Sequence, residues 1–482
     1  MATRNVGAFG VLTSNTKSIA STGMISVAGT LPVDRGAQGF LTHTLRVIEF
    51  TVVRAMNGAT NKVIPLRKNR DTDPSNFTWR RASESMQGDP AEISVAMPPP
   101  YGPTTHPIGY WENGSAAPLE VIARFEVTSG ATIFTTLEIY DSDGTKLGTS
   151  NEVTVTRTGA DYTFIVSDFS VRRTGFYKTD LRFQWRYRIE NRGLFSEVWR
   201  VPFYNFPNRP TEPWNANAPG RENNPWTDAL DLMLNESHTR SAFDNLRGDD
   251  RRNPAKIASI ITEMVNKRLG LVYIGIIQFG YGTVDGPVPD TFDLTRFIDR
   301  VVARLGDPSR SNIRVNCEDC ANIVTTFSNL LGCDLNVLRF GNGFTYNKIR
   351  LIGGWEQGAL LSGWLAGGFG THEVAMVGAN FDHRTRIYDA CLEVDANVFV
   401  DPSQSAPVPL LPAHMQFASR IQFPPEGVDP NDTSAHHYIE LLVVNEQTHL
   451  NNATQIDRTL DNRGRRRASD TRGGNMGRRI II

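Results

Sequence analysis

The spacing of apolar residues changes between residues 207 and 225, and this change limits the folds open to the chain. Before it, apolar and polar residues alternate, most clearly at residues 181–189, LRFQWRYRI. A period of two is typical of strands with one buried face. After it, strand-length runs reappear, among them residues 386–392 and 438–444, and apolar residues recur every three or four positions at residues 226–234 and 257–269. That period is typical of amphipathic helices, so we predict all-β structure followed by mixed α and β structure.

A chain of 482 residues exceeds what one hydrophobic core usually serves, so we expect several domains. The segment before residue 206 contains six strand-length runs separated by turn signals, and five prolines follow it within residues 207–225. We predict the following division: 1–115, a β-rich and loop-rich N-terminal region; 116–206, an Ig-like β-sandwich; 207–222, a Pro-rich linker; 223–455, an α+β domain; and 456–482, a basic disordered tail.

The overall charge does not point to a nucleic acid or membrane partner. The formal net charge is -1, so contact with nucleic acid is expected only through the tail 456–482, which contains eight arginines. A solubilising extension is the simpler interpretation of that tail. The first 20 residues have no continuous apolar stretch of the kind that secretory signals need, and we find no apolar window of membrane-spanning length. We therefore expect a soluble cytoplasmic protein, with export by a route other than Sec left open.

Residues 315–335, VNCEDCANIVTTFSNLLGCDL, show the helical pattern that matters most for function. Apolar residues recur at steps of four, three and four between Cys320 and Leu331. We predict a buried helix over residues 317–331, because this spacing produces one apolar stripe. Gly332 is expected to end it.

Cys317 then lies at the first turn of this helix, where unpaired N–H groups and the helix dipole favour a thiolate. Glu318 and Asp319 would oppose the thiolate if their carboxylates faced the sulfur, so a basic partner is needed. His372 leads an apolar strand, and Asp389 falls on the next predicted strand. On antiparallel neighbours the histidine could take the thiol proton, and the carboxylate could orient the imidazole.

This ordered set resembles the transglutaminase-like branch of the papain-like superfamily. In that family a cysteine precedes an acidic or polar residue, a small residue and an apolar helix, and a strand histidine and a strand aspartate follow. The resemblance covers about half the chain and implies a papain-like, transglutaminase-like catalytic domain over residues 223–455, with no cofactor and no metal. It assigns Cys317 as the nucleophile, His372 as the base and Asp389 as the orienting carboxylate. Asp319 and Ala321 match the motif's acidic and small positions.

Two departures from the family pattern are visible. Cys320 replaces the usual aromatic or apolar residue, and Glu373 replaces the aromatic that often follows the histidine. A second oxyanion donor, besides the Cys317 amide, is expected from Gln278 or Tyr281, since family members use a side chain upstream of the nucleophile.

The resemblance implies acyl transfer from a peptide or carboxamide bond through a thioester, with a protein or peptide as substrate. Of the activities that this resemblance implies, hydrolysis by a peptidase or amidase is the first expectation, and protein crosslinking or deamidation is the second. The alternative is a binding or structural module that keeps the fold and does no chemistry.

The cysteines permit two other interpretations. Cys317 and Cys320 have the spacing of a zinc knuckle or a dithiol redox site, and Cys333 and Cys391 would complete a four-thiolate zinc cluster. Against zinc, there is no second closely spaced pair, and Cys320 and Cys333 are both consistent with small buried hydrophobic residues. The adjacent histidines at 436–437 are a further metal candidate, but surface histidines are the simpler interpretation.

Overall fold

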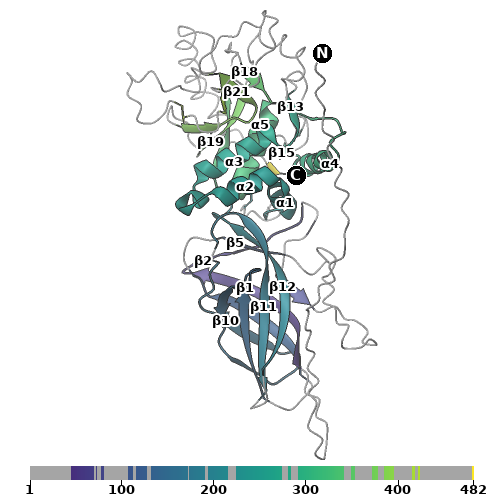
Figure 1. Ribbon diagram of the computed structural model, residues 1–482, viewed down its shortest axis with the longest axis vertical. Coiled ribbons are helices and arrows are strands. Elements are labelled where there is room, and N and C mark those ends of the chain that lie inside the picture. Colours follow the sequence, from purple (N-terminus) through teal and green to yellow (C-terminus); the bar gives the residue numbers. More distant parts are fainter. Residues whose placement is uncertain are drawn as a thin grey trace, which may run out of the picture.

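The computed structural model of the chain describes residues 45–69, 72, 77–80, 107–111, 116–127, 132–171, 173–189, 194–214, 224–273, 281–283, 291–340, 349–352, 372–377, 385–395, 415–417, 422–423 and 480–481. These residues form a strand-rich protein with several sheets, arranged as a β-rich part and a mixed α and β part (Figure 1).

The β-rich part consists of two sheets packed face to face. One has the order β10-β6-β1-β2, with β4 also paired to β1, and the other has the order β3-β5-β12-β11-β7-β8, with β9 also paired to β7. The strands of the first sheet are β1 (Leu45–Asn57), β2 (Thr60–Asn61), β4 (Thr78–Arg80), β6 (Leu119–Val127) and β10 (Asp161–Val166). Those of the second are β3 (Val63–Ile64), β5 (Ile108–Trp111), β7 (Ile133–Tyr140), β8 (Lys146–Thr149), β9 (Val153–Val155), β11 (Tyr177–Ile189) and β12 (Leu194–Phe206).

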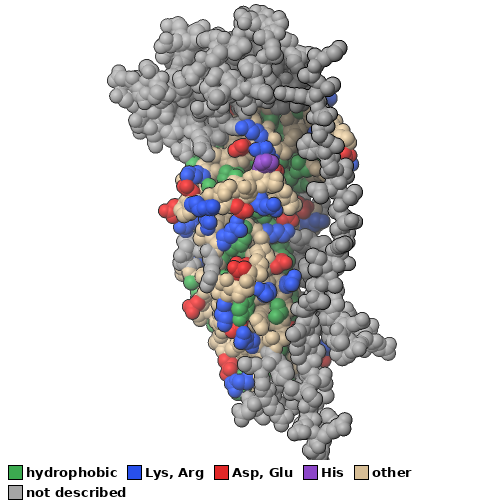
Figure 2. Space-filling model, viewed as in Figure 1, with side chains coloured by type: hydrophobic (Ala, Val, Ile, Leu, Met, Phe, Trp, Pro, Cys, Tyr) green, Lys and Arg blue, Asp and Glu red, His purple; other side chains and the backbone are tan. Residues whose placement is uncertain are grey.

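Aromatic side chains fill the space between these sheets. Phe50 of β1 stacks on Phe183 of β11 at 5.4 Å between ring centroids, and Trp185 meets the edge of Phe125 at 5.6 Å. The predicted alternation is confirmed over residues 181–188, where every second side chain is buried. The intervening side chains face outward, and two of their arginines form ion pairs with carboxylates of the same part: Arg186 with Glu138, and Arg188 with Glu152. Figure 2 shows cations and anions interspersed over one face of the molecule.

The expected boundary near residue 115 does not divide the β-rich part. Strand β1 pairs with β6 from Leu45 opposite Val127 to Ala55 opposite Leu119, and β5 pairs with β12. Residues on both sides of 115 therefore belong to the same two sheets. Local periodicity reveals strands but not their partners, so the sequence could not show that these strands share one core.

The mixed part contains five α-helices and one 3-10 helix within the described residues. They are α1 (Thr227–Asn235), α2 (Ser237–Asn245), η2 (Gly248–Arg252), α3 (Pro254–Lys267), α4 (Leu294–Gly306) and α5 (Cys317–Leu330). The predicted helices at residues 226–234, 257–269 and 317–331 are confirmed as α1, α3 and α5. No helix in the described ranges is long and apolar enough to cross a membrane.

Short strands surround these helices. They are β13 (Leu271–Tyr273), β14 (Gly282–Thr283), β15 (Thr291–Phe292), β16 (Ile313–Val315), β17 (Leu335–Phe340), β18 (Ile349–Leu351), β19 (His372–Val377), β20 (Thr385–Tyr388), β21 (Leu392–Asp395), β22 (Met415–Phe417), β23 (Gln422–Phe423) and β24 (Ile480–Ile481). One sheet has the order β17-β19-β20-β23, and others pair β13 with β16 and join β18, β21 and β22. The strand predicted at 438–444 lies outside the described residues.

Two expectations for this part need correction. The run predicted as one strand at residues 386–392 forms two strands, because the chain turns at residues 389–391 between β20 and β21. The tail is not disordered to its end: Ile480 and Ile481 pair in parallel with Thr291 and Phe292 of β15. Apolar, β-branched isoleucines favour such pairing even after a basic segment.

Helix α5 is the centre of the mixed part. Every residue from Glu318 to Leu330 is buried, and the helix packs against α3, β17 and β19 (Figure 1). The helix ends where predicted: Gly332 has φ +78, a left-handed conformation that favours glycine, and a Cβ there would lie 2.5 Å from the Arg209 carbonyl oxygen. This close approach fixes the connector against the helix end.

The segment that joins the two parts is hydrogen-bonded to α5. The Thr211 N–H donates to the Asn329 carbonyl at 2.9 Å, and the Trp214 indole donates to the Thr326 carbonyl at 2.8 Å. Near Trp214, residues of the β-rich part, including Leu66 and Tyr204, pack into the core of the helices. The two parts therefore share apolar contacts and are not separated by a free linker.

Candidate active site

Cys317 is the first residue of α5, and the cap of this helix shapes its surroundings. The side chain of Asn316 accepts the Asp319 N–H at 2.8 Å, and the Asp319 carboxylate accepts the Asn316 N–H at 3.0 Å. Reciprocal bonds of this kind form a capping box, which begins a helix at a defined residue. The cap leaves Cys317 in the first turn, near the positive end of the helix dipole.

Asp319 is almost fully buried, with 1% of its surface exposed, and both of its oxygens are engaged. One accepts the Asn316 N–H, and the other accepts the backbone N–H of Tyr281 at 2.9 Å. The carboxylate is therefore occupied by backbone donors. It also joins the start of α5 to a segment well upstream in the chain.

Tyr273, the last residue of β13, brings a hydroxyl group to Cys317. Its side chain is buried and is hydrogen-bonded to the Cys317 thiol. Burial raises the pKa of Tyr273 far above its ordinary value, and the neighbouring thiols of Cys391, Cys317 and Cys320 raise it further. The hydroxyl therefore keeps its proton and can donate a hydrogen bond at any ordinary pH.

Backbone hydrogen bonds hold this tyrosine in place. The Tyr273 N–H donates to the Ile352 carbonyl at 2.8 Å, and the Ile352 N–H donates to the Cys391 carbonyl at 2.8 Å. Three segments far apart in sequence thus meet beside Cys317.

The four cysteines are free thiols with different surroundings. Cys317 is partly exposed, whereas Cys320, Cys333 and Cys391 are buried. Burial raises the pKa of Cys391 well above its ordinary value, and its hydrogen bond to Cys320 raises it further. Of the four, Cys317 is the thiol that solvent or a substrate can reach.

Cys320 and Asp389 belong to the same buried cluster. The hydrogen bond from Cys391 lowers the pKa of Cys320, but burial and the charges of Asp319 and Asp389 outweigh it, so the pKa is raised. Asp389 is 1% exposed, and one of its oxygens accepts the Cys391 N–H at 2.8 Å. The structure therefore brings Asp389 to the thiols around the start of α5.

His372 lies at the start of β19, opposite Phe340 of β17. Strand β20 pairs with β19 in antiparallel fashion, with Tyr388 opposite Ala375, so Asp389 directly follows the last paired residue of β20. Strands β19 and β20 are antiparallel neighbours, but Asp389 lies just beyond β20, so the placement of the histidine beside the aspartate stays a prediction. The imidazole itself lies outside the described part of the structure.

The two expected oxyanion donors have different outcomes. Gln278 lies outside the described residues. The Tyr281 hydroxyl is 3.5 Å from an Arg300 nitrogen on α4, and its ring packs edge-on against Phe297. Tyr273 instead supplies the hydroxyl beside Cys317. Its sequence signal was weak, because a tyrosine in a short strand reads as ordinary core.

No group of three or more His, Cys, Asp or Glu side chains in the described ranges is arranged to hold a metal ion. Cys333, the third thiolate of the four-cysteine alternative, lies by the Ala258 backbone and Asp334, and burial raises its pKa. The histidines at 436–437 lie outside the described residues.

Comparison with known proteins adds little. No protein-family model matches the chain, and no curated protein matches it. Among solved structures, that of red sea bream transglutaminase is similar over 57% of this chain and 48% of that one, with 10% sequence identity and a TM-score of 0.32. The chain therefore spans about half the length of that transglutaminase. Similarity at this level establishes neither fold nor activity.

Proposed function

We propose that the chain is a cysteine-dependent acyl-transfer enzyme that acts on peptide or carboxamide bonds. Cys317 is the nucleophile, His372 the general base and Asp389 the carboxylate that orients the imidazole. The observation that carries the proposal is the position of Cys317: a partly exposed thiol in the first turn of a buried helix, hydrogen-bonded to Tyr273. Helix N-termini and hydrogen-bond donors both favour thiolates.

The reaction follows from these groups. His372 accepts the thiol proton, and the Cys317 sulfur attacks the carbonyl carbon of the substrate. The C–N bond breaks as His372 returns the proton to the leaving amine, which leaves an acyl thioester on the sulfur. Water or a second amine then attacks the thioester carbon, the C–S bond breaks, and the thiol is restored. Water gives hydrolysis or deamidation, and an amine gives crosslinking.

The chain also supplies groups for the oxyanion that forms during attack. The Cys317 N–H is at the helix start, and the Tyr273 hydroxyl lies beside the sulfur and keeps its proton. A donor aimed at the developing negative charge typically contributes about 10²- to 10³-fold in rate. We therefore assign Tyr273 as an oxyanion donor or as a donor to the thiolate.

A non-catalytic binding module is the second candidate, and one observation favours it. Asp389 already uses one carboxylate oxygen for the Cys391 N–H, which is a purely structural bond. The two candidates differ in the reactivity of Cys317.

The test is alkylation of the full-length native chain by iodoacetamide at mildly acidic pH, with each thiol followed by mass spectrometry. We expect Cys317 to react fastest and to lose its rate about 10-fold or more in His372→Ala, because the thiolate loses its cationic partner. The matched control is His238→Ala, at an exposed histidine of α2, which should leave the rate unchanged. The comparison of the two histidine variants is needed because its exposure alone would make Cys317 the fastest of the four thiols to be alkylated. Equal rates in the His372 and His238 variants would support the binding module.

A further inference from the structure

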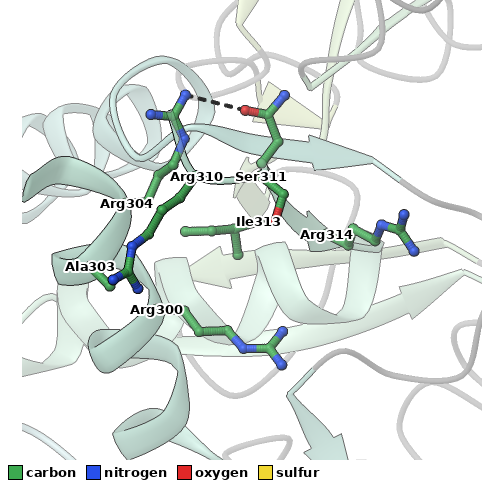
Figure 3. A pocket seen from close by; sticks show the side chains of 8 residues that line it. Arg300, Ala303, Arg304, Arg310, Ser311, Ile313 and Arg314 are labelled. Carbon is green, nitrogen blue, oxygen red and sulfur yellow. Dashed lines mark hydrogen bonds between the residues drawn. The ribbon is translucent and has the colours of Figure 1, made fainter. Parts of the chain in front are cut away.

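Four arginines surround a cavity on the side of the mixed part formed by α4 and β16. The cavity has a volume of about 360 Å³ and is lined by Arg300 and Arg304 of α4, Arg310, Ser311 and Asn312 of the following loop, and Arg314 of β16. Figure 3 shows these side chains around Ile313, the buried residue of β16 that forms its apolar side.

The sequence explains why the arginines gather. Arg300 and Arg304 are four residues apart on α4, so they share one face of the helix. The chain then turns through residues 307–312 and returns as β16, which is in contact with α4. In β16 the burial alternates, with Ile313 inward and Arg314 exposed. Helix, turn and strand thus bring four arginine side chains to the lining of one cavity, with their guanidinium groups spread around Ile313 (Figure 3).

Among the described residues, one ion pair involves this cluster. One carboxylate, Asp307, lies 3.7 Å from Arg310, and both side chains are more than half exposed. Exposed pairs of this kind contribute little. Asp307 itself is held first by hydrogen bonds from Ser309, which lower its pKa, and only then by Arg310 and Arg304.

The other contacts of the cluster are to neutral groups. Arg304 donates to the Asn312 side-chain oxygen at 3.4 Å, and Arg300 lies 3.5 Å from the Tyr281 hydroxyl. The Nε of Arg304 is buried without a hydrogen-bond partner among the described residues. A buried guanidinium N–H without an acceptor is costly.

Several arginines of the β-rich part differ from this cluster, because they form ion pairs with carboxylates. Arg46, Arg54 and Arg124 each pair with a carboxylate of a neighbouring strand. Arg186 pairs with Glu138 of β7, and Arg188 pairs with Glu152, just before β9. A solvated basic face is the simplest interpretation of any single arginine. It does not account for four arginines that line one cavity and have, among the described residues, an ion pair only between Arg310 and the exposed Asp307.

We propose that this arginine cluster binds a small phosphate-bearing anion with two or more phosphate groups. The guanidinium fork matches phosphate oxygens two at a time, and several forks around one cavity suit an anion of multiple charge. The cavity volume lies within the range of about 300–1,000 Å³ that is usual for small-molecule sites. Mutual repulsion among the guanidinium groups would be relieved on binding. Cys317 is not among the residues that line the cavity, and the proposal does not depend on acyl-transfer activity.

The test is isothermal titration of the full-length chain with inorganic tripolyphosphate and, separately, with a nucleoside triphosphate, at fixed ionic strength. We expect saturable binding that weakens about 10-fold or more in Arg304→Ala/Arg314→Ala, because two charge-assisted hydrogen-bond sets are lost. If the chain binds tripolyphosphate and not the nucleotide, the ligand of the cavity is a free polyphosphate. If it binds the nucleotide more tightly, the ligand is a nucleotide.

The matched control removes the same charge elsewhere. Arg157→Ala/Arg240→Ala replaces two exposed arginines, one in the β-rich part and one on α2, and should leave the affinity within about 2-fold. If the Arg304 change disturbs α4, the single variant Arg314→Ala at an exposed position keeps the test valid, since it should still weaken binding several-fold. Circular dichroism checks that each variant is folded.

Three results would overturn the proposal. The first is no saturable binding of either anion by the wild-type chain. The second is equal weakening in the cluster and control variants, which would indicate nonspecific charge attraction. The third is binding only to an RNA oligonucleotide or only to anionic lipid vesicles, in which case the surface would serve a macromolecule or a membrane instead.

Discussion

The carboxylate of Asp319 accepts a hydrogen bond from the backbone N–H of Tyr281 at 2.9 Å, across 38 residues of chain. The same carboxylate completes the capping box with Asn316. One buried side chain therefore begins α5 and attaches the segment before α4 to it. Because Cys317 lies between the two capping residues, its position depends on this carboxylate.

We predict that Asp319→Ala destabilises the mixed part by about 2–4 kcal/mol. The change removes a helix cap and leaves two N–H donors without their acceptor, and one of them is buried. Urea unfolding followed by far-ultraviolet circular dichroism measures the loss. Glu263→Ala, at an exposed position of α3, is the control and should change stability by less than about 0.5 kcal/mol. Similar costs for the two variants would show that Asp319 does not hold the helix start.

We predict that Tyr273→Phe slows alkylation of Cys317 about 2- to 10-fold while leaving the fold intact. Phenylalanine keeps the buried ring, and only the hydrogen bond to the thiol is lost, which is worth about 0.5–1.5 kcal/mol. The measurement is the iodoacetamide rate at mildly acidic pH. Tyr140→Phe removes a hydroxyl that bonds Glu138 in the β-rich part, so it should not alter the rate. An unchanged rate in the Tyr273 variant would remove this hydroxyl from the proposed site.

The contrast between α5 and its surroundings shows what the sequence could reveal. The helix was predictable because its apolar spacing and its terminating Gly332 are local signals. The turn after β20 was not, because it depends on the Asp389 side chain accepting the Cys391 N–H, a bond that strand propensity does not record. Tyr273 could not be found either, since only tertiary contacts bring β13 to Cys317. The sequence thus placed Cys317 at the start of α5 and left its neighbours to long-range packing.

We predict that α2 loses stability in acid through Glu236. This carboxylate caps the helix by accepting the N–H groups of His238 and Thr239. Burial alone would raise its pKa, but hydrogen bonds from Thr239 and His238 outweigh burial and lower the pKa below its ordinary value of 4.5. A lowered folded-state pKa means that the stabilisation is present above the unfolded-state pKa and is lost as the pH falls through the folded-state value.

The measurement is the free energy of unfolding of wild type and Glu236→Gln as the pH is lowered from neutral to well below 4.5. At neutral pH the variant should be less stable by about 0.5–2 kcal/mol, and the difference should shrink in acid. Glu263→Gln, at a more exposed carboxylate, should show no such convergence. A difference that stays constant with pH would mean that the ionised form of Glu236 is not what caps α2.

The last prediction concerns Trp214, which attaches the connector to α5. Its ring is 2% exposed and meets Trp226 edge-on at 5.8 Å, and its indole N–H donates to the Thr326 carbonyl at 2.8 Å. Trp214→Ala removes a large buried ring and should cost about 3–5 kcal/mol. Trp214→Phe keeps much of the ring but leaves a buried carbonyl of α5 without this donor, so a cost of about 1–3 kcal/mol is expected.

Trp111→Phe is the matched control, because the indole of Trp111 donates to the Asn61 carbonyl at a more exposed site of the β-rich part. Its cost should be the smaller of the two Trp→Phe changes, since water can replace an exposed donor. If Trp111→Phe proves as costly as Trp214→Phe, the hydrogen bond to α5 adds nothing to the attachment, and apolar contact alone holds the connector. The expected order, with Trp214→Ala most costly and Trp111→Phe least, would mean that connector and helix unfold together.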